Sequence, residues 1–320
     1  MRLLKLVPDN TNIGFVRLRY WAFGLTLALT IASVFLTVTR GLNMGVDFVG
    51  GVMVEAKFVQ PPQLDKLRGD LDALHVGDVS LQQFGGRDTV SIRLPLPKSS
   101  DEGASNALIK VVRGSLASHY PGVVISRADT VSAKVSGELI RNGVLAVVLA
   151  VFGIALWGIV RFEWQFGVST FVAILHDVLV TLGFFALTRL EFDLNIVAAV
   201  LTIIGYSIND KIVIDDRIRE NLRKYRQMDI RSLIDLSVNE TLPRTVMTSL
   251  TILLALGALL LFGGHVLRGF TAAMMLGIVV GTYSSIYVSS SLLITLGLGR
   301  NRADVRADTS KAERVGRPTP

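Results

Sequence analysis

The sequence contains no cysteine and only four histidines among its 320 residues. Without cysteine, disulfide bonds are excluded. His75 and His119 lie at no metal-ligand spacing, so we expect them at the surface or at helix ends. No G-x-x-x-x-G-K-[ST] run is present, which argues against ATP as the direct energy source. The apolar runs contain no paired carboxylates and no nucleophile–base spacing. We therefore expect no metal, no cofactor and no enzymatic activity.

Charged residues are also scarce, at 18% of the chain, whereas hydrophobic residues make up 50%. This balance excludes an ordinary soluble protein. Six apolar runs of membrane length predict an α-helical polytopic membrane protein. The expected organisation is a tail at 1–19, a first span at 20–38, a polar domain at 41–137, five further spans within 139–298 that include a charged helical loop at 216–244, and a tail at 299–320.

The net charge of +7 could suggest a nucleic-acid partner, but the placement of the basic residues argues against one. They cluster before the first span, within 217–244 and after residue 299. By the positive-inside rule, both termini and the 216–244 loop are expected in the cytoplasm. The first apolar run follows basic residues, as a signal peptide does. Its length and the lack of a small-residue cleavage site favour an uncleaved anchor.

The polar segment 41–137 carries its own alternating pattern. Val52, Val54, Ala56 and Phe58 would share one face of a strand. Further strands are expected near 79–81, 90–94 and 123–127, with helices near 64–74 and 101–118. The order βαββαβ is that of a ferredoxin-like α+β domain. We find no catalytic constellation in it, so a binding or docking role is expected.

A glycine-rich motif, Gly45–Gly51 (GVDFVGG), leads into this domain. Gly50 and Gly51 relieve steric limits on the backbone, which favours a sharp reorientation into the following strand. Asp47 is expected to cap local backbone amides in the turn, and a direct functional role is the alternative.

Two ionisable residues, His176 and Asp177, lie near the centre of the third expected span. At that depth such residues indicate a functional site. The alternative is a hydrogen-bonded contact that ties this helix to its neighbours. The sequence does not separate the two.

The fourth apolar run gives the strongest functional signal. The run Leu194–Ile208 would extend only about 22 Å as a helix, whereas a hydrocarbon core is roughly 30 Å thick. Continuation to Ile214 gives about 31 Å and places Asn209 and Asp210 inside the membrane. A carboxylate there costs about 3 kcal/mol and usually faces a partner or a water-filled path.

Arg244 is the candidate partner of Asp210. The fifth span is expected to begin near Thr241, with Pro243 in its first turn, so that Arg244 lies at the cytoplasmic boundary. We hypothesise that Asp210 and Arg244 form an ion pair that opens when Asp210 takes a proton. A permanent structural salt bridge is the alternative.

Two other charged residues of the fourth span are expected to pair with each other. Lys211 points about 100° away from Asp210 and can reach Asp215, four residues on. We expect this pair near the cytoplasmic surface.

In the sixth span, Gly277 and Gly281 form a G-x-x-x-G face for close helix contact, either inside the bundle or with a partner subunit.

Seven motifs together resemble the SecF family, the smaller subunits of bacterial SecD–SecF protein-export complexes. The most specific are GYSIND at 205–210 and DRIREN at 216–221. The others are GVDFVGG at 45–51, VSGEL at 135–139, RFEW at 161–164, LHD at 175–177 and LPRT at 242–245. The resemblance covers nearly the whole chain.

The resemblance implies a six-helix half of an RND-superfamily protein in the bacterial inner membrane, with its polar domain in the periplasm. It implies a SecD subunit and the SecYEG translocon as partners, with YajC as an optional partner. The transported species would be a translocating polypeptide and protons. Proton motive force would drive late steps of translocation, with Asp210 and Arg244 at the family's proposed proton-path positions. Members usually lack the charges at Lys211 and Asp215, whose joint change supports their pairing.

Two other functions remain open. A passive scaffold would stabilise the export channel and could dock through the small-residue face of the sixth span. A small-molecule RND-type proton antiporter would need large outside domains with an apolar pocket, and the domain expected here is small.

Overall fold

The computed structural model describes residue 8 and residues 11–77, 79–83, 86–96, 102–264 and 267–298. The expected tail at 299–320 and most of the first ten residues lie outside this part. Six helices within it are long and apolar enough to cross a membrane, which confirms the predicted polytopic fold. They are α1 (Arg19–Arg40), α5 (Ala133–Arg161), α6 (Trp164–Thr188), α7 (Leu194–Lys224), α8 (Ile230–Phe262) and α9 (Arg268–Tyr283), which continues through the π-helical segment η2 (Ser284–Ser289) into α10 (Ser290–Thr295).

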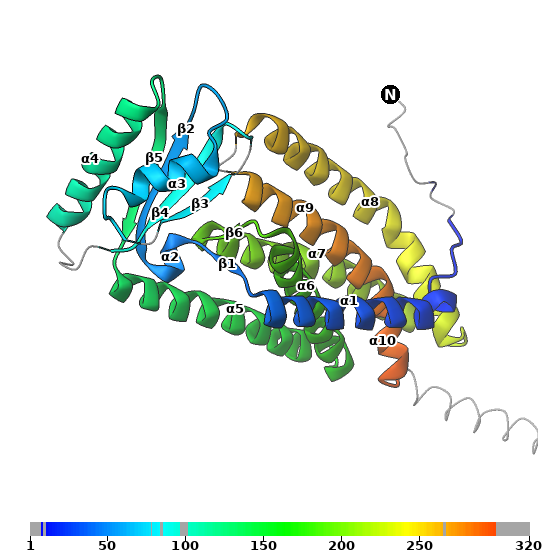
Figure 1. Ribbon diagram of the computed structural model, residues 1–320. Helices are drawn as coiled ribbons and strands as arrows, with labels where there is room; N and C mark the ends of the chain where they lie inside the picture. Colours follow the sequence, from blue (N-terminus) through cyan, green and yellow to red (C-terminus); the bar gives the residue numbers. More distant parts are fainter. Residues whose placement is uncertain are drawn as a thin grey trace, which may run out of the picture.

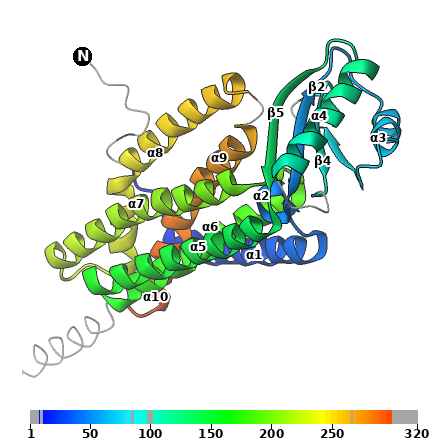
Figure 2. The same ribbon diagram turned by 90° about the vertical axis from the view of Figure 1, so that its left-hand side faces the viewer.

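The helices form one bundle, with an α/β domain at one end (Figures 1 and 2). We call this the domain end of the bundle; α1 begins and α10 finishes at the opposite, far end. Helices α6 and α9 are the most buried, whereas α1, α5 and α8 expose most of their apolar side chains. Hydrocarbon is as apolar as these side chains, so the three exposed helices suit contact with lipid or with another membrane protein.

The charged segment expected at 216–244 is almost entirely helical. Helix α7 continues to Lys224 and α8 begins at Ile230, so only five residues separate them. An apolar stripe joins the two extensions, and Asn221 of α7 donates hydrogen bonds to Ser237 Oγ at 3.0 Å and Glu240 Oε2 at 2.7 Å on α8. This antiparallel contact extends the bundle beyond its apolar part.

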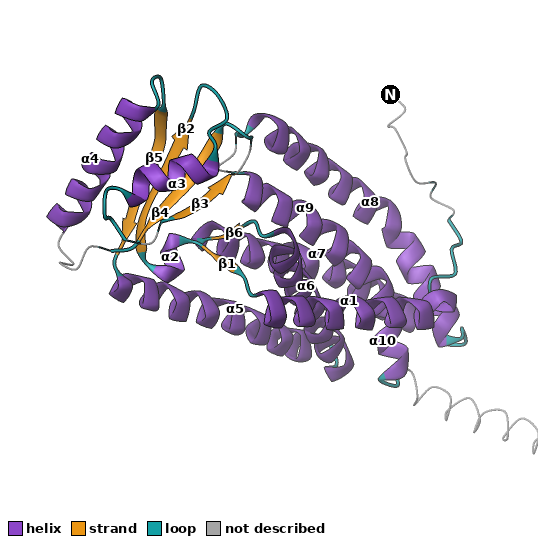
Figure 3. Ribbon diagram, viewed as in Figure 1, coloured by secondary structure: helices purple, strands orange, loops and turns teal. Residues whose placement is uncertain are grey.

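The α/β domain has the predicted order of strands and helices (Figure 3). Its elements are β2 (Gly51–Lys57), α3 (Leu64–Asp72), β3 (Ser80–Gln83), β4 (Thr89–Leu94), α4 (Glu102–His119) and β5 (Val124–Val131). The sheet is antiparallel with spatial order β3-β4-β2-β5, which is the ferredoxin-like arrangement and confirms the predicted fold.

Alternation along the strands positions the core of this domain. Val52, Val54 and Ala56 are fully buried on the face that the helices cover, where they meet Leu67 and Leu71 of α3.

Beside this core, the hydroxyl of Tyr120 donates a hydrogen bond to Asp70 at 2.8 Å and ties the end of α4 to α3. Burial, together with this bond, raises the pKa of Tyr120 to about 12. As expected, His119 ends α4, and His75 is exposed just beyond α3.

A short β-ribbon joins the domain to the bundle. Strand β1 (Asn43–Met44), which follows α1, pairs in parallel with β6 (Glu191–Phe192), which lies between α6 and α7. The chain then turns through α2 (Val46–Val49) and enters β2 through Gly50 and Gly51. Their φ angles of 76° and 132° are accessible mainly to glycine, which explains the paired glycines at this reorientation.

The G-x-x-x-G face of α9 lies inside the bundle, against α7. A side chain at Gly277 would overlap Ile203, and one at Gly281 would meet Ser207 at 3.1 Å. The structure therefore decides between the two contacts that the sequence left open, because α7 already occupies this face.

We expect Gly277→Ala to destabilise the protein by about 1–3 kcal/mol, because the added methyl group has no room beside Ile203. Gly257→Ala on α8 is the matched control, since nothing lies within 4 Å of the position that its Cβ would take. The measurement is the free energy of unfolding during SDS titration in mixed micelles. Equal stability of the two variants would contradict the close contact.

Candidate functional site

Asp210 lies in the middle of a continuous helix, about 24 Å along its axis from Leu194. The residue is 3% exposed, and its Oδ2 is buried without a hydrogen-bond partner. Asn209, its neighbour, is exposed on another face of α7. The structure therefore holds one carboxylate oxygen of Asp210 inside the protein without the hydrogen bond that such a group requires.

Arg244 is the charged residue whose electrostatic field acts on Asp210. It is exposed on α8, and no salt bridge joins the two side chains in the described part of the chain. The ion pair hypothesised from the sequence is therefore not closed in this arrangement, and its role stays a prediction. An exposed guanidinium on a long side chain opposite a buried acid suits a contact that forms and breaks.

The prediction for Pro243 was wrong. This residue lies inside α8, thirteen positions after Ile230, rather than in a first turn. The expectation failed because the helix begins much earlier in the chain, where Leu233, Ile234 and Val238 pack against α7. A proline inside a helix removes one backbone hydrogen bond, so the helix is weakened one residue before Arg244.

The predicted pair of Lys211 and Asp215 is confirmed. The Lys211 ammonium lies 3.0 Å from Asp215 Oδ2 and 3.2 Å from Oδ1. Both side chains are only 3% exposed, and the position of the pair near the cytoplasmic surface of the membrane stays a prediction. Packing of α7 against its neighbouring helices encloses the pair. Lys211 and Asp215 neutralise each other, so neither of them is the partner of Asp210.

His176 and Asp177 belong to a buried polar cluster that joins three helices. Asp177 Oδ2 accepts hydrogen bonds from Ser207 Oγ of α7 at 2.7 Å and from Ser284 Oγ of η2 at 3.0 Å, and its Oδ1 lies 3.1 Å from His176 Nδ1. The His176 Nε2 atom is buried without a partner in the described structure. Ser207 precedes Asp210 by three residues and so lies on the same face of α7.

The cluster coincides with an irregular helix. Segment η2 is π-helical, a form that occurs mostly as short bulges and often at functional sites. Ser285 Oγ reaches across to the Ser207 carbonyl at 3.3 Å, so η2 and α7 share a second contact. The bonded serines fit the alternative of a contact that ties helices together, whereas the open His176 nitrogen fits a functional role. Both readings stay predictions.

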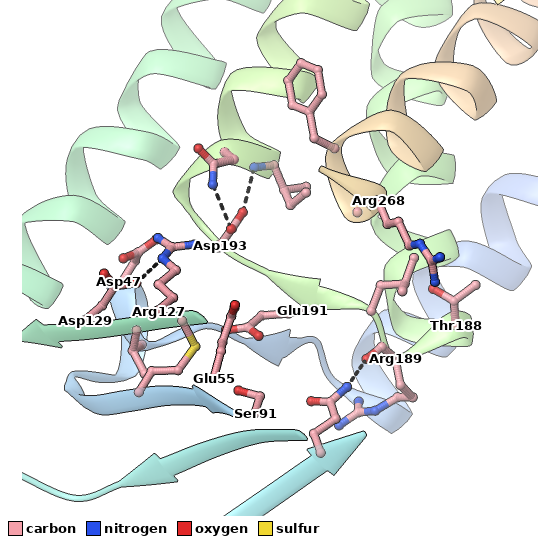
Figure 4. Close-up of a pocket in the computed structure, with 18 of the residues that line it drawn as sticks. Asp47, Glu55, Ser91, Arg127, Asp129, Thr188, Arg189, Glu191, Asp193 and Arg268 are labelled. Atoms are coloured by element: carbon pink, nitrogen blue, oxygen red, sulfur yellow. Dashed lines mark hydrogen bonds and ion pairs between the residues drawn. The ribbon is translucent and has the colours of Figure 1, made fainter. Parts of the chain in front are cut away.

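A cavity of about 340 Å³ separates the sheet from the domain end of the bundle (Figure 4). Asp47 lines it and accepts a hydrogen bond from the backbone N–H of Leu194 at 2.9 Å, while Asp193 accepts from that of Ile196 at 3.1 Å. Two carboxylates thus cap α7. Asp47 therefore does cap a backbone amide, but one that is 147 residues away rather than local.

Among the described residues, no group of three or more histidine, aspartate or glutamate side chains could hold a metal ion. No local pattern in the sequence identified the serines around Asp177 or the polar contacts at the domain end. Those partners come from distant parts of the chain.

Comparison with known families gives two matches. The description "Protein export membrane protein SecD/SecF, C-terminal" matches residues 111–299, and "SecD/SecF GG Motif" matches residues 35–62. The second match contains the Gly50–Gly51 turn. Together they cover most of the bundle and the entry into the α/β domain.

Two relatives of similar length share one description. The chain is 42% identical to "Protein translocase subunit SecF" of Cereibacter sphaeroides over 97% of this chain and 98% of that protein. It is also 42% identical to the protein of the same description from Rickettsia rickettsii, over 91% and 94% of the two chains.

Solved structures show the same arrangement. The chain superposes on SecDF, a translocon-associated membrane protein from Thermus thermophilus, with a TM-score of 0.81 and 36% identity over 90% of this chain. A SecDF structure in a super-membrane-facing form gives a TM-score of 0.67 and 32% identity over 97% of this chain. The chain spans 39% and 41% of those longer chains.

Proposed function

Since this chain belongs to the SecD/SecF family of protein-export membrane proteins, we propose that it assists protein translocation across the bacterial inner membrane together with a SecD subunit. The solved relative SecDF is longer than this chain, which supports a second subunit that supplies the rest of the assembly. The exposed apolar faces of α1, α5 and α8 offer surface for such a partner. The SecYEG translocon and YajC are the other partners in this proposal.

We further propose that proton motive force drives the process through Asp210 and Arg244. The single observation that carries this is the buried Asp210 oxygen without a partner, opposite an exposed arginine. An ionised Asp210 attracts Arg244, and a protonated one releases it. One proton that crosses 100 mV supplies about 2.3 kcal/mol, enough to bias such a change. In this proposal the termini lie in the cytoplasm and the α/β domain in the periplasm.

The test uses the chain together with its SecD partner and SecYEG in proteoliposomes. We expect an imposed proton gradient to increase the yield of fully translocated protein, and we expect an uncoupler to remove the increase. A passive scaffold predicts equal yields with and without the gradient. A small-molecule antiporter predicts proton flux in vesicles that lack the translocon and its polypeptide substrate.

One structural observation weighs against the scaffold in the form considered from the sequence. That form used the G-x-x-x-G face of α9 for docking, and Gly277 instead contacts Ile203 of the same chain. The ferredoxin-like domain, with a single sheet and two helices, also offers little of the outside volume that a small-molecule exporter needs.

A further inference from the structure

Arg93 of β4 lies where the α/β domain meets the domain end of the bundle. Its Nη2 atom forms an ion pair with Glu191 Oε2 at 2.9 Å. Its Nη1 atom donates hydrogen bonds to the Met44 carbonyl at 2.9 Å and to Asn43 Oδ1 at 3.4 Å. Asn43 and Met44 follow α1, and Glu191 lies between α6 and α7. One guanidinium of the domain therefore contacts both the segment that follows α1 and the connector between α6 and α7.

The two connectors are hydrogen-bonded to each other. The parallel ribbon pairs Asn43 with Glu191, and the Gly45 N–H donates to the Phe192 carbonyl at 2.8 Å. A second side chain of the domain, Gln82, accepts a hydrogen bond at Oε1 from Asn43 Nδ2 at 2.9 Å. We call the set Asn43, Met44, Arg93 and Glu191 the domain seat.

We propose that Arg93 and Glu191 are positioning residues, which hold the α/β domain on the bundle and pass displacements of the α6–α7 connector to that domain. Their side chains are 18% and 28% exposed, so the ion pair is partly shielded from water. The cavity of about 340 Å³ beside the seat is open space rather than close-packed core. Loss of the ion pair can therefore change the orientation of the domain without the disruption of a packed interior.

The seat holds Glu191 at an electrostatic cost. Burial raises the pKa of Glu191; Arg93 on β4 opposes this rise, whereas Asp193 before α7 and Glu55 on β2 add to it. The other charged groups that line the same cavity are Asp47, Arg127, Asp129, Arg189 and Arg268.

The experiment measures the position of the domain directly. The chain has no cysteine, so Lys110→Cys on α4 and Leu267→Cys beside α9 introduce two unique sites for spin labels, both of them exposed. Distances between the labels are measured in the complex with SecD in nanodiscs. We expect Arg93→Glu to add a second population of distances or to broaden the distribution. Combining it with Glu191→Arg, which restores opposite charges, should return the original distribution.

Lys57→Glu is the matched control, because Lys57 pairs with Asp88 inside the domain, 3.9 Å away. It should leave the distances unchanged. If Arg93→Glu prevents assembly, Arg93→Gln removes only the charge and serves in its place. Distances that are the same in the wild type, the Arg93 variants and Glu191→Arg would overturn the proposal. Because no translocation is measured, this outcome is separate from failure of the proposed proton-driven function.

Discussion

Replacing Asp210 with asparagine is expected to abolish the increase in translocation that a proton gradient produces. Asparagine keeps the size of the side chain but cannot exchange a proton near neutral pH, so Arg244 has no changing charge to follow. About 2.3 kcal/mol per proton at 100 mV corresponds to a bias of about fiftyfold, which sets the largest effect that one site can lose. The measurement is the yield of fully translocated protein in proteoliposomes with and without the gradient.

Arg244 provides the second half of this test. Arg244→Met removes the charge and should give the same loss as Asp210→Asn, and the double variant should be no worse than either single one, because the two residues act as a unit. Arg244→Lys keeps the charge and should retain part of the response. Asp216→Asn is the control, since Asp216 is an exposed acid on the same helix.

Two results would contradict a role of Asp210 in the proton path. If Asp210→Asn lowers translocation equally with and without the gradient, and lowers the amount of SecD that co-purifies, then Asp210 is a structural residue. A permanent salt bridge and a passive scaffold both predict that outcome. A full gradient response in the Asp210→Asn variant, with normal assembly, would also remove Asp210 from the proton path.

The sequence predicted those features that depend on short spacings along the chain. Lys211 and Asp215 are four residues apart on one helix, so geometry alone brings them together. The strands of the α/β domain followed from alternation, because Val52 and Val54 must face the same side of a sheet. The sharp turn at Gly50 and Gly51 followed from the paired glycines, because their backbone freedom permits the φ angles that the turn requires.

The features that the sequence missed depend on contacts between distant segments. Pro243 looked like a helix start because polar residues precede it, but the apolar Leu233, Ile234 and Val238 among them pack against α7, and the helix runs through the whole stretch. The bond from Leu194 to Asp47 spans 147 residues, and the bond from Ser284 to Asp177 spans 107. No local pattern encodes such pairs, since only the packing of the bundle brings their helices together.

The second large effect is expected at the buried pair of α7. Lys211→Met leaves the Asp215 carboxylate enclosed without its cation, and breaking a buried pair from one side costs about 3–5 kcal/mol. Asp215→Leu should cost a similar amount by stranding the ammonium. The double variant, Lys211→Met with Asp215→Leu, removes both charges and should be nearly as stable as the wild type. Unfolding free energies during SDS titration provide the comparison.

The double variant also separates the two charged sites of α7. Lys211 forms its ion pair with Asp215, and the field that acts on Asp210 comes from Arg244. A chain that lacks both members of the pair should therefore keep its response to a proton gradient, whereas Asp210→Asn loses it. If the double variant is stable and assembled but no longer responds, the pair takes part in proton coupling, and the division of α7 into a self-neutralised pair and one switching acid is wrong.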